Sequence, residues 1–328
     1  MYTSIIQIAG ERLPSRTSRG SNVVILLSML LFLFLYNWTA QAIPLAHVAS
    51  QDKKVNIESL VRLQEVGKDE LHLLARQTGL HPEFVETILQ DGRGRELLRF
   101  QQRYFAPIQV AGRNTTPLTI SEILVDEGGN ATTGMPLADI HDGDILITKN
   151  SRFFGWRNGH AALVVDAEKG LVLEAVMLGL DTQLRDIRKW SRYPSFQVLR
   201  LKAEYDMADN ELIDGHAADI KTGQKDIRNQ HSLSQKVAEY AQKHLVEIPY
   251  SLTAGLAEKL WKRAGTKVYA RDAEGKEGSS PPTTHCAHLV WYAYEQFGLD
   301  LDSDGGLFVT PEDIRNSKYL EIIQTYGY

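Results

Sequence analysis

The sequence predicts an α+β protein in which a small antiparallel sheet packs against helices. Short segments rich in Val, Ile and Leu follow one another between residues 144 and 201, separated by turn residues, which is typical of strands that pair with their sequence neighbours. At 56–105, 232–244 and 286–297, apolar residues recur every three or four positions, which is typical of helices. A chain of 328 residues with 43% hydrophobic composition can bury the core that such a fold needs.

An uncharged apolar run at residues 23–36 has the length of a signal-peptide core and follows several arginines. Small residues at Ala40 and Ala42 fit the A-x-A cleavage pattern. We therefore expect residues 1–42 to be a cleaved signal peptide and the protein to be periplasmic or secreted. The alternative is an uncleaved inner-membrane anchor at residues 23–42, and with either outcome the apolar run is the expected point of membrane association.

The remainder of the chain divides by pattern. Residues 43–106 are expected to form a helical N-terminal segment, because apolar residues keep a helical spacing on both sides of a break at Gly79-Leu-His-Pro82. Residues 107–136 alternate short apolar runs with Gly, Asn and Thr turns, and they are expected to form a connector of strand and loop. Residues 137–328 then form the main domain.

The main domain begins with apolar segments that predict the antiparallel sheet, namely 144–148, 161–165, 171–176 and 196–201. The turn at 168–170 is short enough to make a hairpin of the second and third strands. A polar loop at 204–230 follows, and helices are expected at 232–244 and 252–261. A segment rich in Gly, Ser and Pro at 264–284 predicts a long surface loop.

Cys286 is the only cysteine, so it has no internal disulfide partner and serves either packing or chemistry. Two prolines exclude a helix just upstream, whereas residues 287–297 are strongly helical. This places Thr284 or His285 at the N-cap and Cys286 in the first turn. Unpaired backbone N–H groups and the positive end of the helix dipole would stabilise a thiolate there and could also hold an oxyanion. The position at the mouth of the helix favours a nucleophile.

A thiol nucleophile needs a base, and His160 is the strongest candidate among the ten histidines. It follows Gly159 and directly precedes the strand 161–165, which would fix its backbone. Glu174 lies within an apolar run on the next strand, where a carboxylate is costly unless it is paired. Pairing of the two strands would bring Glu174 beside His160, as the orienting residue of a triad with Cys286.

These residues, in this order, resemble the permuted papain-like amidases of the YaeF/YiiX type, a branch of the NlpC superfamily of cysteine hydrolases. The resemblance covers roughly Leu137 to Ile323 and does not extend to the helical segment. The histidine precedes the cysteine in that branch, as His160 precedes Cys286 here. The sequence departs from the branch at His288 and in the long insert 264–284. The matching segments are Gly143-Asp144-Ile-Leu-Ile-Thr148, Gly159-His160, Leu173-Glu174-Ala175, Ile248-Pro-Tyr250, Cys286-x-x-Leu289-Val290-Trp-x-Ala293-Tyr294 and Thr310-Pro311-x-Asp313.

The resemblance implies a permuted papain-like fold, in which a small antiparallel sheet carries helices on one side and the cysteine opens a helix. It implies Cys286 as the nucleophile, His160 as the base and Glu174 as the polar third residue. The residues that we expect around the oxyanion and the substrate are Gly159, Tyr250, His285 and His288.

Together these roles predict an enzyme that cleaves an amide bond through an acyl-enzyme, with neither a cofactor nor a metal. The expected substrate is a small-molecule, peptide or lipid amide, and for an exported protein cell-wall peptide comes first, which makes peptidoglycan the expected partner. The 36 Lys and Arg against 41 Asp and Glu give a net charge of −5, so we exclude nucleic acid as a partner.

Other readings stay open at this point. The same machinery on the same fold could act as a lipid-directed thiol amidase or acyltransferase. His285, Cys286 and His288 together with His160 could form a zinc site, although their spacing does not match the patterns that make such a site specific. A catalytically inactive binding module is the remaining alternative.

Overall fold

The computed structural model describes residues 19–41, 47–116, 119–153, 156–206, 231–256, 259–260 and 281–328. The chain forms two compact units, residues 1–43 and residues 44–328.

Within the described residues, the first unit consists of helix α1 (Arg19–Gln41), which contains the apolar run predicted as a signal-peptide core. Side chains between Val23 and Leu35 are almost all exposed. Of the helices that the structure describes, none combines the length and the apolar character needed to cross a membrane. The predicted cleavage position at Ala42 lies outside the described residues, so cleavage stays a prediction.

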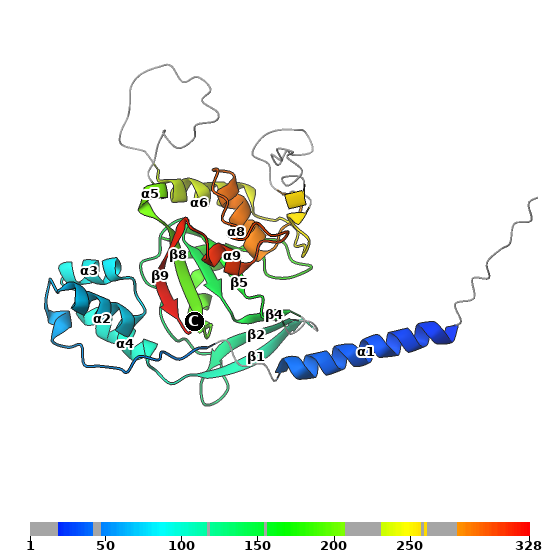
Figure 1. Ribbon diagram of the computed structural model, residues 1–328, viewed down its shortest axis with the longest axis horizontal. Helices are drawn as coiled ribbons and strands as arrows, with labels where there is room; N and C mark the ends of the chain where they lie inside the picture. Colours follow the sequence, from blue (N-terminus) through cyan, green and yellow to red (C-terminus); the bar gives the residue numbers. More distant parts are fainter. Residues whose placement is uncertain are drawn as a thin grey trace, which may run out of the picture. The chain divides into compact units, whose positions relative to one another are not determined.

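The second unit is built around a six-stranded sheet in which every neighbouring pair is antiparallel, in the order β7-β6-β5-β3-β8-β9. Figure 1 labels β5, β8 and β9 of this sheet. The expected α+β class with an antiparallel sheet is confirmed, and the predicted strands correspond to β3, β5, β6 and β8. The bounds of the strands are β3 (Ile145–Thr148), β5 (His160–Asp166), β6 (Leu171–Glu174), β7 (Gln183–Asp186), β8 (Phe196–Leu201) and β9 (Leu320–Tyr326).

Successive side chains of a strand point to opposite faces of the sheet. In this sheet both faces carry buried apolar side chains, and both faces are covered. Leu163 and the other odd-numbered residues of β5 pack against α6 (Leu233–His244) and α8 (Cys286–Glu295), which lie next to each other in Figure 1. Ala162 and Val164 belong to the core on the opposite face. The resemblance implied helices on one side only, so the second covered face is an addition to that expectation.

The second core is shared with the N-terminal helices. Leu97 and Phe100 of α4 belong to the same cluster as Phe196 and Val198 of β8. The segment comprises the 3₁₀ turn η1 (Leu60–Arg62) and the helices α2 (Lys68–Thr78), α3 (Pro82–Gln90) and α4 (Arg95–Tyr104). It is therefore packed into the same compact unit as the sheet.

The break between α2 and α3 lies where the sequence places it. Gly79 ends α2 in the left-handed conformation (φ 70°), which glycine adopts without strain, and Pro82 occupies the first turn of α3. The backbone of this break pairs with β9, since the Thr325 N–H donates to the Gly79 carbonyl at 2.8 Å and the His81 N–H donates to the Ile323 carbonyl at 2.8 Å. The helical segment thus covers part of an edge strand.

The predicted connector forms a second, three-stranded antiparallel sheet in the order β1-β2-β4. Its first two strands, β1 (Gln109–Thr116) and β2 (Thr119–Val125), make a hairpin. The third, β4 (Ser151–Phe153), comes from the chain between β3 and β5. The connector is therefore attached to the segment that leads to His160.

Helix starts follow the sequence signals. Ser232 and Gln235 form a capping box at α6, and Thr310 and Asp313 form another at α9 (Pro311–Arg315). The predicted loop 204–230 is wrong at its start, because residues 204–206 belong to the short helix α5 (Ala203–Asp206). Most of that loop, most of the loop 264–284 and part of the predicted helix 252–261 lie outside the described residues.

The shared core leads to a prediction about cooperativity. Leu97→Ala removes a side chain that is fully buried between α4 and the sheet. We expect it to lower the free energy of unfolding by about 2–5 kcal/mol and to leave one transition for the whole second unit. Urea unfolding followed in parallel by far-UV circular dichroism and by exposure of the Cys286 thiol checks this. Separate midpoints for the two probes would mean that the helices fold apart from the sheet.

Candidate active site

The N-terminus of α8 positions the thiol. His285 is the N-cap, in an extended conformation, and its side chain accepts a hydrogen bond from the His288 N–H at 3.3 Å. Cys286 is the first residue of the helix, as predicted, and it is half-buried. The thiol therefore lies in the first turn, where helix N–H groups have no partner within the helix.

His160 is the first residue of β5 and pairs with Thr148, the last residue of β3. Gly159 precedes it with φ 67°, and a Cβ atom there would lie 2.5 Å from the Thr148 carbonyl oxygen. Only glycine fits this close approach without strain. The sequence assigned Gly159 to the substrate site, and the structure gives it this backbone role beside His160.

Glu174 is the last residue of β6 and is fully buried. Leu163 pairs with Leu173 and Val164 pairs with Val172, so Glu174 and His160 point to the same face as diagonal neighbours. Glu174 Oε1 lies 3.5 Å from His160 Nε2. The expected pairing is therefore present, and it leaves Nδ1 of the imidazole free to face another partner.

That partner is Cys286. Burial alone would raise the pKa of the Cys286 thiol, but hydrogen bonds with His160 and His285 lower it to about 5. Burial opposes protonation of His160, but hydrogen bonds with Cys286 and Glu174, together with their negative charges, raise its pKa to about 9. The structure thus brings Cys286, His160 and Glu174 together, and between these values the first two form a thiolate–imidazolium pair.

Three groups around Glu174 were not predicted from the sequence. Lys189 and Trp190, both in the 3₁₀ helix η2 (Ile187–Arg192), donate to the carboxylate, with the Trp190 Nε1 at 2.9 Å from Oε1, and the Arg185 Nε lies 3.9 Å from Oε2. Burial would raise the pKa of Glu174, but His160 and Lys189 lower it to about 2. The carboxylate is therefore ionised throughout the neutral range.

Trp190 has a second contact in the site. Its fully buried indole stacks on the imidazole of His160, with ring centroids 5.7 Å apart and an angle of 15° between the planes. One side chain therefore holds both members of the His160–Glu174 pair and keeps water from their contact. No local pattern marked Trp190, because the contact depends on how η2 folds back after β7.

Tyr250 lies beside the thiol, as the resemblance implied. Its backbone forms a parallel bridge with Thr284, two residues before Cys286. Burial and the negative charge of Cys286 both raise the pKa of its hydroxyl, so Tyr250 keeps its proton and can donate a hydrogen bond.

The two other histidines differ in what they can do. Because His285 Nδ1 accepts from a backbone N–H, the neutral ring carries its proton on Nε2, where it can donate towards the sulfur side. His288 is fully buried and its Nδ1 lies 3.0 Å from Thr284 Oγ1. The structure therefore gives His288 a supporting position behind Thr284, in place of the substrate-facing position expected from the sequence.

The zinc alternative requires the ligand atoms of His160, His285, Cys286 and His288 to converge. Within the described residues, the group of three or more ligand atoms that lie close together is Asp302, Asp304 and Asp313, which contains none of them. Two of the histidines already use a ring nitrogen for the helix start. The geometry of the four residues thus fits acid–base chemistry better than metal binding.

Comparisons with models of protein families, with curated protein sequences and with solved structures give no match for this chain. The interpretation of the site therefore rests on its own residues and their geometry.

The ion pair predicts the reactivity of the thiol. Iodoacetamide should alkylate Cys286 with a pH midpoint near 5 in the wild type. In His160→Ala the midpoint should rise by about three units, towards the ordinary thiol value of about 8.5, because burial of the thiol is no longer opposed by the imidazolium. His72→Ala, a change at an exposed histidine, is the control and should leave the profile unchanged. Equal midpoints in wild type and His160→Ala would show that Cys286 and His160 do not form an ion pair.

The two contacts of Trp190 give a second prediction. Trp190→Phe keeps an aromatic ring over His160 but deletes the donor to Glu174. The carboxylate charge is then shared with one donor fewer and stabilises the imidazolium more strongly, so we expect the alkylation midpoint to fall by about one pH unit or less. Trp291→Phe is the matched control, because the Trp291 indole also donates to a carboxylate, Asp300, at 2.7 Å. If both changes shift the midpoint equally, the effect comes from loss of packing and not from Glu174.

Proposed function

We propose that the chain is a cysteine hydrolase that cleaves an amide bond through an acyl-enzyme. The observation that carries the proposal is the contact of Cys286, at the first position of a helix, with a histidine that a buried carboxylate holds in place. Each part supplies one requirement of nucleophilic catalysis, namely a thiolate, an acid–base group and a residue that orients it.

The chemistry follows from the pair. The Cys286 thiolate attacks the amide carbon, and the carbonyl oxygen takes the negative charge. The donors that we assign to this oxyanion are the N–H groups at the start of α8 and the Nε2–H of His285. The His160 imidazolium then gives its proton to the amide nitrogen, the C–N bond breaks, and a thioester on Cys286 remains. Water, deprotonated by His160, attacks the thioester and releases the acid.

Within this proposal, the fold is the permuted papain-like fold of the YaeF/YiiX type. The motifs that start at Gly143, Gly159 and Cys286, and the order of His160 before Cys286, support it. The antiparallel sheet with α6 and α8 on one face is consistent with it. The helical segment before β1 is then an addition to the family pattern.

We propose cell-wall peptide as the first substrate class, in an exported protein. The apolar run in α1 and the small residues that follow support export. The catalytic role needs no cofactor, because the residues present supply the nucleophile, the proton transfer and the oxyanion donors.

A lipid amide is the second candidate, and one observation favours it. Large apolar side chains are exposed in segments next to the catalytic residues: Trp156 (76% exposed) before His160, Leu178 (55% exposed) after Glu174 and Leu252 (38% exposed) after Tyr250. An acyl chain would bury such side chains, whereas a polar peptide would not.

The test is hydrolysis by wild type and Cys286→Ala, with peptidoglycan fragments in one arm and N-acyl amides in the other. We expect the wild type to release product in one arm and Cys286→Ala to be slower by about 10³-fold or more. A thioester of the acyl group on Cys286, found by mass spectrometry after rapid acid quenching, would support the acyl-enzyme. Activity that Cys286→Ala retains in full would overturn the proposal.

A further inference from the structure

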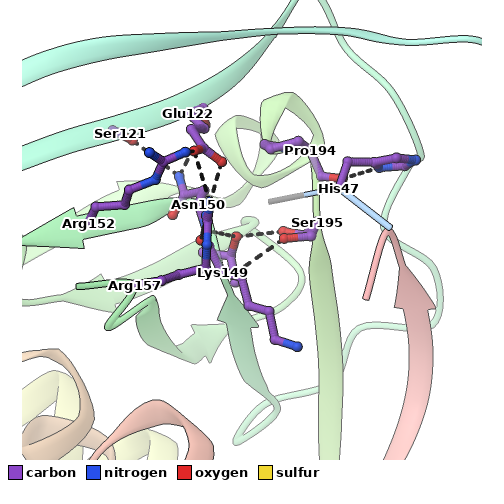
Figure 2. Close-up of polar contacts among 10 residues, drawn as sticks. His47, Ser121, Glu122, Lys149, Asn150, Arg152, Arg157, Pro194 and Ser195 are labelled. Atoms are coloured by element: carbon purple, nitrogen blue, oxygen red, sulfur yellow. Dashed lines mark hydrogen bonds and ion pairs between the residues drawn. The ribbon is translucent and has the colours of Figure 1, made fainter. Parts of the chain in front are cut away.

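A buried carboxylate lies beside the chain segment that leads to His160. Glu122 of β2 is fully buried and accepts hydrogen bonds from Arg152 of β4 and from Arg157 (Figure 2). Arg157 binds it through two nitrogens, at 3.0 Å from Oε2 and 3.1 Å from Oε1. A buried charge is tolerated when it is paired and hydrogen-bonded in this way, and the two-pronged contact also fixes the direction of the guanidinium.

The same guanidinium links the chain that follows β3 to the chain that precedes β5. Arg157 Nη1 donates to the Lys149 carbonyl at 2.6 Å, so residues near the two ends of the chain between these strands are joined. The Gly159 N–H donates to the Ser151 carbonyl at 3.1 Å, and the Glu122 N–H donates to the Asn150 carbonyl at 2.8 Å. Residues 149–151 are therefore bound both to residues 157–159 and to the neighbouring strand β2.

His160 lies next to these contacts in the chain and in the sheet. Lys149 follows Thr148, the strand partner of His160, and Arg157 is three residues before His160. A displacement of Arg157 is therefore passed to the start of β5, which carries the imidazole. The contacts of Arg157 with Glu122 and with the Lys149 carbonyl connect it to the chain that carries His160, so the influence on the thiol that we expect acts through the position of His160.

We propose that Glu122 and Arg157 are positioning residues for His160, which hold the imidazole in reach of Cys286 through the contacts that join residues 149–152 to residues 157–159. This inference rests on the proposed function, in which His160 is the partner of the thiolate. The competing explanation is that the ion cluster only stabilises the three-stranded sheet. A purely stabilising cluster would change the melting temperature but not the titration of a thiol in the folded protein.

The chain offers a matched control at the other end of β3. Arg200 also binds a buried carboxylate through two nitrogens, to Asp144 at 2.9 and 2.8 Å, and its side chain is as buried as that of Arg157 (18% against 20% exposed). Asp144 directly precedes β3, whereas Thr148 ends it. Loss of Arg200 should therefore destabilise the fold by a similar amount without moving His160.

The experiment measures the pH dependence of Cys286 alkylation in the full chain for wild type, His160→Ala, Arg157→Gln and Arg200→Gln, at a temperature where circular dichroism shows each variant to be folded. We expect the midpoint in Arg157→Gln to rise by about one pH unit, part of the one to three units that a nearby opposite charge contributes, and the midpoint in Arg200→Gln to stay at the wild-type value. Arg157→Lys keeps the charge but cannot bind the carboxylate through two nitrogens, so its midpoint should lie between those of wild type and Arg157→Gln.

The outcomes separate the two proposals. An unshifted midpoint in His160→Ala overturns the proposed function and this inference with it. A shift in His160→Ala with no shift in Arg157→Gln, or equal shifts in Arg157→Gln and Arg200→Gln, overturns this inference alone. Should Arg157→Gln fail to fold, Arg157→Lys decides by the same criterion.

Discussion

The contact between the start of α8 and the start of β5 is the interaction on which the rest of the site depends. A thiolate is stable at Cys286 because hydrogen bonds with His160 and His285 share its charge, and the imidazolium is stable because Glu174 and Cys286 lie on its two sides. A pair of this kind requires the end of a helix and the end of a sheet to meet within a few ångströms. The packing of α8 on one face of the sheet, through residues such as Leu289 and Ala293, provides that alignment.

The opposite face explains why the frame is rigid. The N-terminal helices and the even-numbered positions of β5 contribute to one core on this face, and Trp190 fills the same core while its indole reaches Glu174 and His160. The elements that carry the polar groups of the site are therefore held by two separate cores, one on each face of the sheet. Rigid support of this kind matters because a shift of about 1 Å in a reacting group can cost a factor of about 100 in rate.

Local signals and long-range contacts differ in how far the sequence reveals them. Helix starts at Ser232, His285 and Thr310, and the strands with continuous apolar runs, could be predicted because capping and burial leave local patterns. Cys286, His160 and Glu174 could be selected because a lone thiol at a helix start and a carboxylate in an apolar run are both unusual. Strands β4, β7 and β9 lack such runs, and their pairing depends on partners far away in the chain. Trp190, Lys189 and Arg157 were missed for the same reason: each matters through one contact that only the folded register creates.

The charges around Glu174 set a limit on how strongly His160 holds its proton. A buried carboxylate whose only partner was the imidazole would stabilise the imidazolium so well that proton transfer to a leaving amine would become unfavourable. Lys189 and Trp190 donate to the same carboxylate, and Arg185 lies near it, so its charge is shared among several donors. The ion pair is then strong enough to generate the thiolate at neutral pH and weak enough to release the proton. Stabilisation of the thiolate lowers its nucleophilicity as well as its pKa, so useful catalysis depends on donors that bind the oxyanion more tightly than the sulfur. His285 and the first N–H groups of α8 are the donors placed to make that difference.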